Sequence, residues 1–223
     1  LLSEKHACPM KRFILPLMIL TAAVASAAEP WICTTAGRRL IYEESIGGVR
    51  TGTLDKLVAS DDNGEITLTY TKENNPIVER WRLYPDSTVL QIEVPAEMQA
   101  LLDTLQVRDV DFRTRNLALP AEMNPGDLFP GFGFSVSGTR GDERTTLSVR
   151  SDSVRVASCG PIRTPAGKFD AVRLEFRTLT TLGDQEVAGR MIQWMAPGIG
   201  LVRQEIPVCE GVASVVELKK ITQ

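Results

Sequence analysis

The sequence predicts an all-β protein, with an antiparallel barrel-like or two-sheet fold of about a dozen short strands and one short covering helix at 95–106. Three observations predict this fold. Apolar and polar residues alternate at every second position along most of the chain, turn-forming residues separate these stretches, and a single stretch has a helical period instead. The chain has 223 residues, of which 43% are hydrophobic and 24% charged, an ordinary composition for a folded domain.

The alternation identifies the strands. It is clearest in three sets of apolar residues separated by polar ones, namely Ile66, Leu68 and Tyr70; Leu90, Ile92 and Val94; and Val172, Leu174 and Phe176. This pattern is typical of a strand with one buried face and one solvent face. Further strands are expected at 39–46, 49–58, 77–84, 107–114, 131–137, 145–157, 186–195, 199–207 and 212–221.

Turns and one helix complete the expected architecture. Tight turns are predicted at Gly47-Gly48, Asp62-Asn63-Gly64, Asn75-Pro76, Pro85-Asp86 and Gly183-Asp184. In the stretch 95–106, apolar residues follow the i, i+3, i+4, i+7 spacing of a helix face, and Pro95 suits its first turn. We expect this helix to cover one end or edge of the sheet. Residues 115–130, which contain three prolines, are expected to form the longest connection.

The first residues have the features of a secretory leader. Lys11 and Arg12 precede an apolar run at 13–24, and Ala25-Ser26-Ala27 follows as a cleavage site. The run is shorter than the roughly 20 residues that span a membrane. We therefore expect residues 1–9 to precede the true start, residues 10–27 to be a signal peptide cleaved near Ala27, and residues 28–223 to form a single exported domain, periplasmic or secreted. No cysteine follows the cleavage site directly, so no lipoprotein signal is expected.

Composition excludes several classes of function. The net charge of −3 gives no electrostatic reason to expect nucleic-acid binding. The only histidine, His6, lies in the leader, so the exported chain has none. Without histidine there is no Ser-His-Asp or Cys-His catalytic machinery and no histidine metal site. We expect a protein that is not an enzyme, with no cofactor, no metal and no transmembrane span after cleavage.

Three cysteines, Cys33, Cys159 and Cys209, remain once Cys8 is lost with the leader. An oxidising compartment permits one disulfide and one free thiol. If the strands from residue 145 to 207 form a meander, Cys159 and Cys209 lie at opposite ends of strands that are about 26–34 Å long, too far apart to pair. Cys33 is therefore the expected partner of either Cys159 or Cys209. We choose Cys33–Cys209 as the expected disulfide, and three free thiols are the alternative.

The candidate binding residues are tryptophans. Trp81 and Trp194 are interpreted as core anchors or, alternatively, as part of the lining of a ligand mouth. The neighbouring carboxylates Glu43-Glu44, Asp61-Asp62 and Asp109/Asp111 are expected to lie on solvated faces rather than to form a catalytic pair or a calcium site.

Several turn motifs resemble a known family. In order, these are Leu119-Pro120 with 124–127 (N-P-G-D), then 164–169 (T-P-A-G-K-F), then 194–202 (W-M-A-P-G-I-G-L-V). Together with Cys33, Gly37 and Tyr42 near the start, they resemble exported bacterial proteins grouped as a domain of unknown function. Members often have a cysteine directly after the motif phenylalanine, where this chain has Asp170. The resemblance implies an antiparallel barrel-like fold and an envelope location, and it implies no catalytic residues.

Three functions follow from these expectations. The first is a non-catalytic exported envelope protein that binds an apolar ligand, a lipid or another envelope component in a β-barrel. The second is a structural or protein-interaction module of the envelope, which an exposed apolar patch would favour. The third is a hydrolase that uses carboxylates, for which a cleft with convergent acidic residues would be the signature.

Overall fold

The computed structural model describes residues 28–60, 63–94, 98, 102–104 and 106–223. Within these residues the chain forms fourteen strands. They are β1 (Arg39–Ile46), β2 (Val49–Ser60), β3 (Glu65–Lys72), β4 (Asn75–Leu83), β5 (Ser87–Gln91), β6 (Arg108–Arg115), β7 (Leu117–Pro120), β8 (Leu128–Pro130), β9 (Gly133–Arg140), β10 (Glu143–Thr164), β11 (Gly167–Leu182), β12 (Gln185–Ala196), β13 (Gly200–Cys209) and β14 (Val212–Thr222).

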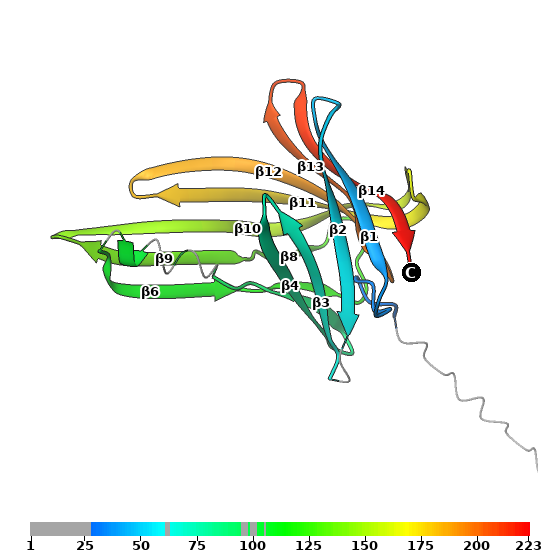
Figure 1. The fold of residues 1–223 in the computed structure, drawn as a ribbon, viewed down its shortest axis with the longest axis horizontal. Helices are drawn as coiled ribbons and strands as arrows, with labels where there is room; N and C mark the ends of the chain where they lie inside the picture. Colours follow the sequence, from blue (N-terminus) through cyan, green and yellow to red (C-terminus); the bar gives the residue numbers. More distant parts are fainter. Residues whose placement is uncertain (1–27, 61–62, 95–97, 99–101, 105) are drawn as a thin grey trace, which may run out of the picture.

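All the strands belong to one antiparallel sheet, which is nearly closed into a barrel (Figure 1). Their order is β6-β9-β10-β11-β12-β13-β14-β1-β2-β3-β4-β5-β7, and β8 pairs with β10. The last strand in this order, β7, contacts β8, and β8 pairs with β10 near the other end of the order. The two ends of the sheet therefore lie close together. This return confirms the predicted barrel-like fold, because it brings the two ends of the strand order together.

Part of the sheet extends away from the barrel. We call it the wing: β6, β9 and the portions of β10, β11 and β12 at 143–152, 177–182 and 185–190, drawn to the left in Figure 1. The long strand β10 has a register shift between Ser151 and Val154, at the junction of wing and barrel. A β-bulge of this kind bends a strand and increases its twist.

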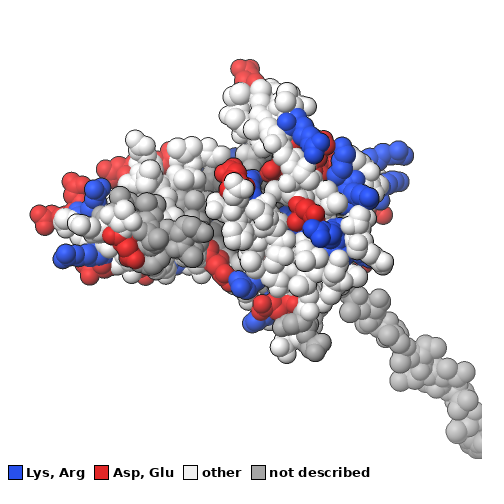
Figure 2. Space-filling model, in the orientation of Figure 1, with Lys and Arg blue, Asp and Glu red and all other residues white. Residues whose placement is uncertain are grey.

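The residues in the apolar phase of the predicted alternation face the core of the barrel. Leu174 and Phe176 in β11 are 0% and 1% exposed, whereas Arg173 and Glu175 lie on the outer face and pair with each other at 2.9 Å. The predicted meander is also confirmed, because β10, β11, β12 and β13 pair in sequence order. On the face seen in Figure 2, acidic and basic side chains are interspersed over the barrel strands.

One end of the barrel is closed by the segment that precedes β1. We call residues 30–33 the strap. The Trp31 indole N–H donates to the carbonyl oxygen of Pro120 at 2.7 Å, and its backbone N–H donates to Thr88 Oγ at 3.1 Å. The carbonyl oxygen of Pro30 accepts a 2.7 Å hydrogen bond from the backbone of Gly198. The strap therefore ties β5, β7 and the β12–β13 turn together.

Three local expectations need correction. The strand expected at 90–94 is β5, which ends at Gln91. The turn expected at Asn75-Pro76 lies two residues earlier, where Glu73 and Asn74 have φ angles of 51° and 66°. Pro76 is tolerated near the start of β4, where a missing N–H costs little. The connection expected at 115–130 contains the short strands β7 and β8, because it pairs with the rims of the sheet.

The expected helix at 95–106 lies largely outside the described residues. Met98 and residues 102–104 are helical, and Leu102 is 9% exposed. Directly after this segment, Val107 lies over β9: a Cβ added to Gly138 would be 2.4 Å from the Val107 side chain. A residue without a side chain at position 138 therefore lets Val107 cover this part of the sheet.

Candidate functional site: the barrel interior

The inward side chains of the barrel enclose a cavity of about 250 Å³. Cross-strand pairing sets Trp81 beside Leu90, and Leu90 beside Leu117, so three apolar side chains from β4, β5 and β7 form one row of its lining. The strap contributes Ile32, and β13 contributes Leu201. Six polar side chains also line the cavity, namely Glu44, Lys56, Lys72, Glu79, Gln193 and Gln204.

The register separates an apolar end of the cavity from a polar end. The strap lies against the strand ends that contain Trp81 and Leu117, and this end is apolar. Toward the other end of the barrel, Glu44 in β1 faces Lys72 in β3, and their charged atoms are 3.0 Å apart. The cavity can therefore hold a molecule with an apolar part at the strap end and a polar part further along.

A buried ion pair lies between these two ends. Lys56 is 6% exposed, and its ammonium nitrogen is 2.6 Å from Glu79 Oε1. The Tyr70 hydroxyl donates to the same oxygen at 2.9 Å, and the ammonium lies 4.5 Å from the centre of the Tyr70 ring. Removing charges from water costs several kcal/mol, which only a well-placed partner offsets. The Lys56–Glu79 pair is thus a charged group of side chains within a mainly apolar interior.

Tyr42 and Tyr70 remain protonated in this environment. Burial raises the pKa of both phenols above the ordinary value of 10.0, and the nearby Glu79 carboxylate adds to the effect. The Tyr42 hydroxyl donates to the carbonyl oxygen of Leu201 at 2.8 Å. Both hydroxyls therefore act as hydrogen-bond donors to the protein and are not poised to ionise as nucleophiles or bases.

Trp81 has the one unsatisfied buried polar atom among the side chains that the structure describes. The residue is 5% exposed and lines the cavity, and its indole N–H has no hydrogen-bond partner. A buried donor without an acceptor costs about 1–3 kcal/mol, so such groups are rare in native proteins. The nitrogen itself has almost no accessible surface, so it lies packed within the barrel wall.

Comparisons with known proteins place the chain in a family. The family described as DUF3108-like matches residues 69–206, which is more than half of the chain. The chain belongs to the DUF3108-like family. Comparison with curated proteins gives no match.

Two solved structures share the fold of this DUF3108-like chain. A Bacteroides fragilis protein, described as exported and as having a YmcC-like fold, is 19% identical with a TM-score of 0.62, over 87% of this chain and 100% of its own. A Parabacteroides distasonis protein, described as a lipoprotein, is 16% identical with a TM-score of 0.62, over 88% and 100% of the two chains. At these identities the likeness concerns the fold alone.

Backbone groups of the turn motifs form hydrogen bonds with other segments of the barrel in this DUF3108-like chain. Pro120 accepts the Trp31 indole hydrogen bond described above. The backbone of Gly126 donates to the carbonyl oxygen of Val156 at 2.8 Å, and that of Ala166 donates to Leu218 at 3.2 Å. All these contacts involve a backbone group in the motif. These contacts give the motifs an architectural role, and the side chains of Ile199 and Leu201 in the last motif also line the cavity.

Trp194, the second tryptophan predicted to bind ligand, does not line the cavity. It lies on the outer face of β12, between Gln193 and Met195, which do line it. Its ring is 5.6 Å from the Arg173 guanidinium and 5.9 Å from that of Arg203. The two-residue period explains the difference, because Trp194 has the opposite phase to its two neighbours.

The predicted Cys33–Cys209 disulfide does not form in this structure. All three thiols of the described cysteines are free; Cys33 is buried, and Cys159 and Cys209 are exposed. Cys33 lies before the first residue of β1. Cys209 pairs with Val212 of β14, close to Ser214, which pairs with Ile46 at the other end of β1. The length of β1, about 23 Å for its 8 residues, separates the two thiols.

Sequence reasoning missed the buried ion pair. Lys56 lies between Leu54 and Val58 in the inward phase of β2, and Glu79 occupies the inward phase of β4 two residues before Trp81. A charged residue in the apolar phase of an alternating strand was the available signal. It was not singled out, because β3 separates the two strands and the sequence gives no hint that the charges meet.

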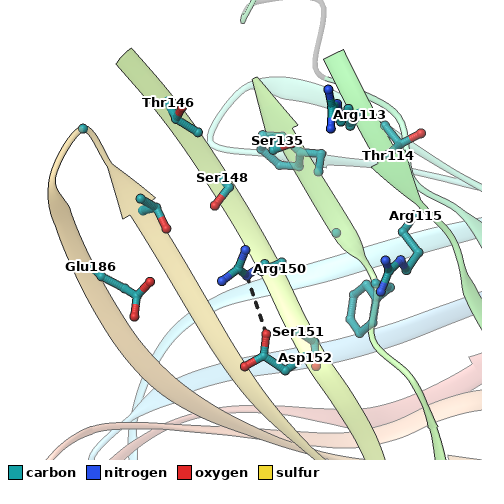
Figure 3. Close-up of a pocket in the computed structure, with 15 residues that line it drawn as sticks. Arg113, Thr114, Arg115, Ser135, Thr146, Ser148, Arg150, Ser151, Asp152 and Glu186 are labelled. Carbon is teal, nitrogen blue, oxygen red and sulfur yellow. Dashed lines mark ion pairs between the residues drawn. The ribbon is translucent and has the colours of Figure 1, made fainter. Parts of the chain in front are cut away.

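A second hollow, of about 840 Å³, lies on the wing over β6, β9, β10 and the β11–β12 hairpin (Figure 3). Its floor includes the buried hydroxyl side chain of Ser148. Arg150 pairs with Asp152 at 3.5 Å, and Arg113 pairs with Asp111 at 2.8 Å. This surface is lined mainly by polar side chains, whereas the barrel interior is lined mainly by apolar ones.

The expected carboxylate neighbours are not gathered into a catalytic pair in the part of the chain that is described. Glu43 points outward and pairs with Lys219 at 3.0 Å, whereas Glu44 points inward and pairs with Lys72. Asp61-Asp62 lies outside the described residues. Among the described residues no cluster of three or more potential metal ligands occurs, and no helix there is long and apolar enough to span a membrane.

Proposed function

We propose that this DUF3108-like chain is a non-catalytic, exported protein of the cell envelope that binds a small apolar or lipid-like ligand inside its barrel. Residues 10–27 would direct export, and residues 28–223 would fold as one domain after cleavage near Ala27. The basic residues, apolar run and Ala25-Ser26-Ala27 site support the export step.

The observation that carries the proposal is the cavity in the barrel interior. Ligand sites are concave and mainly apolar, with a few polar groups that fix orientation. The interior has these features: an apolar row at the strap end and a few polar side chains beyond it. Its volume of about 250 Å³ is slightly below the range of about 300–1,000 Å³ that is usual for drug-sized ligands. A short chain or a single ring fits this volume.

The experiment is ligand detection followed by a cavity-filling variant. Native mass spectrometry of the exported protein tests for a co-purified small molecule, and displacement of the fluorescent apolar probe N-phenyl-1-naphthylamine measures binding. Leu90→Phe adds volume inside the cavity, so we expect it to weaken probe binding by about tenfold. The matched control is Leu182→Phe, since Leu182 lies on the wing and is 62% exposed. Equal probe binding by both variants would refute the proposal.

One observation favours a second candidate, a protein-interaction module. The wing presents an apolar face, on which Val149, Leu182 and Val187 are 40%, 62% and 67% exposed. Val149 and Val187 both pair with Thr180, so all three side chains project from one face. This candidate predicts that Val187→Glu abolishes a crosslinked product in intact cells that the unmodified chain and the Leu90→Phe variant both form.

A further inference from the structure

The hollow on the wing combines two arginines with a buried hydroxyl. We propose that it binds a phosphate group, which Arg115 and Arg150 hold from two sides while the Ser148 hydroxyl donates a hydrogen bond from the floor. The site lies on the wing, outside the barrel interior, so this inference does not depend on the proposed function.

The first step concerns position. Gly133 in β9 pairs with Arg115 in β6 and with Arg150 in β10, so the Cα atoms of the two arginines are two strand spacings apart, about 10 Å. Gly133 has no side chain, and a Cβ added there would collide with the carbonyl oxygen of Val149. The space between the two arginines is therefore free of side chains from β9. Both arginines line the hollow (Figure 3).

The second step concerns the partners of these two arginines. Arg115 has no ion pair and no hydrogen bond with any described residue. Arg150 Nε is 3.5 Å from Asp152 Oδ1, which is longer than a normal hydrogen bond, and both side chains are about half exposed. Exposed ion pairs of this kind are weak. Arg150 is therefore available to an incoming anion, and Asp152 is the carboxylate that competes for it.

The other charges near the hollow lie further from this point or are already paired. Arg113 pairs with Asp111 at 2.8 Å and adds no net charge. Glu186 lies in β12, two strands beyond β10 and on the other side of the hollow from Arg115 (Figure 3). Positive charge is thus concentrated around Arg115 and Arg150, and it attracts an anion to that part of the hollow.

The third step concerns the hydroxyl on the floor. Ser148 is 4% exposed and lies two residues before Arg150 in β10, so their Cα atoms are about 6.6 Å apart. Its hydroxyl forms no hydrogen bond within the part of the chain that is described. Trp81 has the one fully enclosed polar side-chain atom without a partner there, so the Ser148 oxygen is reachable from the hollow. Buried polar groups are usually hydrogen-bonded, and a ligand oxygen in the hollow would satisfy this one.

These three groups suit a tetrahedral oxyanion. Guanidinium groups bind phosphate and carboxylate through paired, charge-assisted hydrogen bonds. The three free oxygens of a phosphate monoester can contact both arginines and Ser148 at once, whereas a carboxylate has one oxygen fewer. The phosphate can belong to a soluble ester or to a phospholipid head group, and the test separates these two sources.

The test is isothermal titration calorimetry of the full exported chain with three probes of similar size: glycerol 3-phosphate, glycerate and glycerol. We expect glycerol 3-phosphate to bind about tenfold more tightly than glycerate, and glycerol to show no binding. Equal binding of the phosphate and the carboxylate, or no binding of the phosphate, would overturn the inference.

Variants assign the binding to the three groups. Arg115→Gln and Arg150→Gln should each weaken the binding of glycerol 3-phosphate by about tenfold, and Ser148→Ala by about threefold. Arg140→Gln is the matched control, because Arg140 ends β9 in the opposite phase to the lining residue Ser135, and it should leave the affinity unchanged. Equal weakening by Arg140→Gln would mean general charge attraction and would also overturn the inference.

A further variant acts in the opposite direction. Asp152→Asn removes the carboxylate that competes for Arg150, so the affinity for glycerol 3-phosphate should rise by about two- to fivefold. Asp142→Asn makes the same change in the exposed β9–β10 turn and should have no effect. A lower affinity in Asp152→Asn would contradict the proposed arrangement.

Vesicles identify the source of the phosphate. Cosedimentation of the chain with phosphatidylglycerol vesicles, lost in Arg115→Gln, would assign the site to a phospholipid head group. Binding of glycerol 3-phosphate without cosedimentation would assign it to a soluble phosphate ester. Either result supports the phosphate site, and neither concerns the apolar cavity of the barrel, so failure of this inference and failure of the proposed function are distinguishable.

Discussion

At the scale of single residues, the side of the strand on which a residue lies determines what it does. Phe176 and Arg177 are neighbours in β11, yet Phe176 is 1% exposed and Arg177 lies at the surface. The ring of Phe176 meets that of Phe132 edge to face, with centroids 5.7 Å apart. Substitutions should therefore differ sharply between the two faces.

Phe176→Asp should lower the free energy of unfolding by about 3–5 kcal/mol, because it removes the buried ring and leaves an unpaired charge in its place. Urea denaturation measures the effect. Phe112→Asp is the matched control, since Phe112 lies on the wing and is 38% exposed, and its cost should be below about 1 kcal/mol. A Phe176→Asp protein as stable as the unmodified chain would show that the phase of β11 is wrong.

The buried tyrosines give stability a dependence on alkaline pH. Burial raises the folded-state pKa of Tyr42 and Tyr70 above 10.0, the value expected in the unfolded chain. Unfolding therefore releases protons above pH 10, so the contribution of these two tyrosines to stability is constant below that pH and falls above it, by about 1.4 kcal/mol per pH unit for each tyrosine. Urea denaturation at increasing pH measures the slope.

The control for this prediction is the third tyrosine. Tyr84 is 48% exposed, and Tyr84→Phe should leave the alkaline slope unchanged. The double variant Tyr42→Phe/Tyr70→Phe should flatten the slope, although it also lowers stability at neutral pH through two lost hydrogen bonds. A slope that persists in the double variant would assign the effect to other groups.

At the scale of elements, the strap connects parts of the barrel that are far apart in the sequence. Trp31 is 5% exposed and hydrogen-bonds to Pro120 and Thr88, which lie 89 and 57 residues away. Close approach also matters: a Cβ added to Gly200 would be 3.2 Å from the Ile32 side chain. The strap is thus packed into the barrel end rather than laid over it.

Trp31→Ala should lower the free energy of unfolding by about 3–5 kcal/mol and should expose the β12–β13 turn to faster amide exchange. Hydrogen exchange at Gly198 reports the release, because its N–H donates to the strap. Trp194→Ala is the matched control and should cost less, since that ring lies on the outer face of the sheet. Equal costs for the two variants would mean that the strap is not part of the folded core.

The elements also show which features a sequence can predict. Alternation predicted most strands, because one buried face imposes a two-residue period on the chain. It missed β7 and β8, which have 4 and 3 residues and are too short to show a period. It also missed the meeting of Lys56 with Glu79, because which strands face each other across a barrel depends on closure, and no local pattern encodes closure.

At the scale of the whole molecule, the predicted cleavage near Ala27 can be compared with the start of the described residues at Ala28. Among the described residues, the first contacts are those of Glu29, whose side chain lies beside Gly198, and of Pro30, whose carbonyl oxygen accepts the hydrogen bond from Gly198. Cleavage near Ala27 would leave two or three residues before that contact, so the strap would remain complete in the mature protein.

The last prediction follows from this arrangement. Protein expressed from Met10 in a Gram-negative host should be recovered from the periplasm with its N-terminus within a few residues of Ala28, as Edman sequencing reads it. Ala27→Arg places a large charged residue in the A-x-A site and should prevent cleavage, so the uncleaved chain stays with the membrane fraction. A chain that begins at Ala28, expressed without a leader and refolded, should match the exported protein in unfolding temperature. Recovery of intact Lys11-Arg12 in the soluble periplasmic fraction would refute the leader, whereas failure of the chain that begins at Ala28 to fold would show that the fold needs residues upstream of the strap.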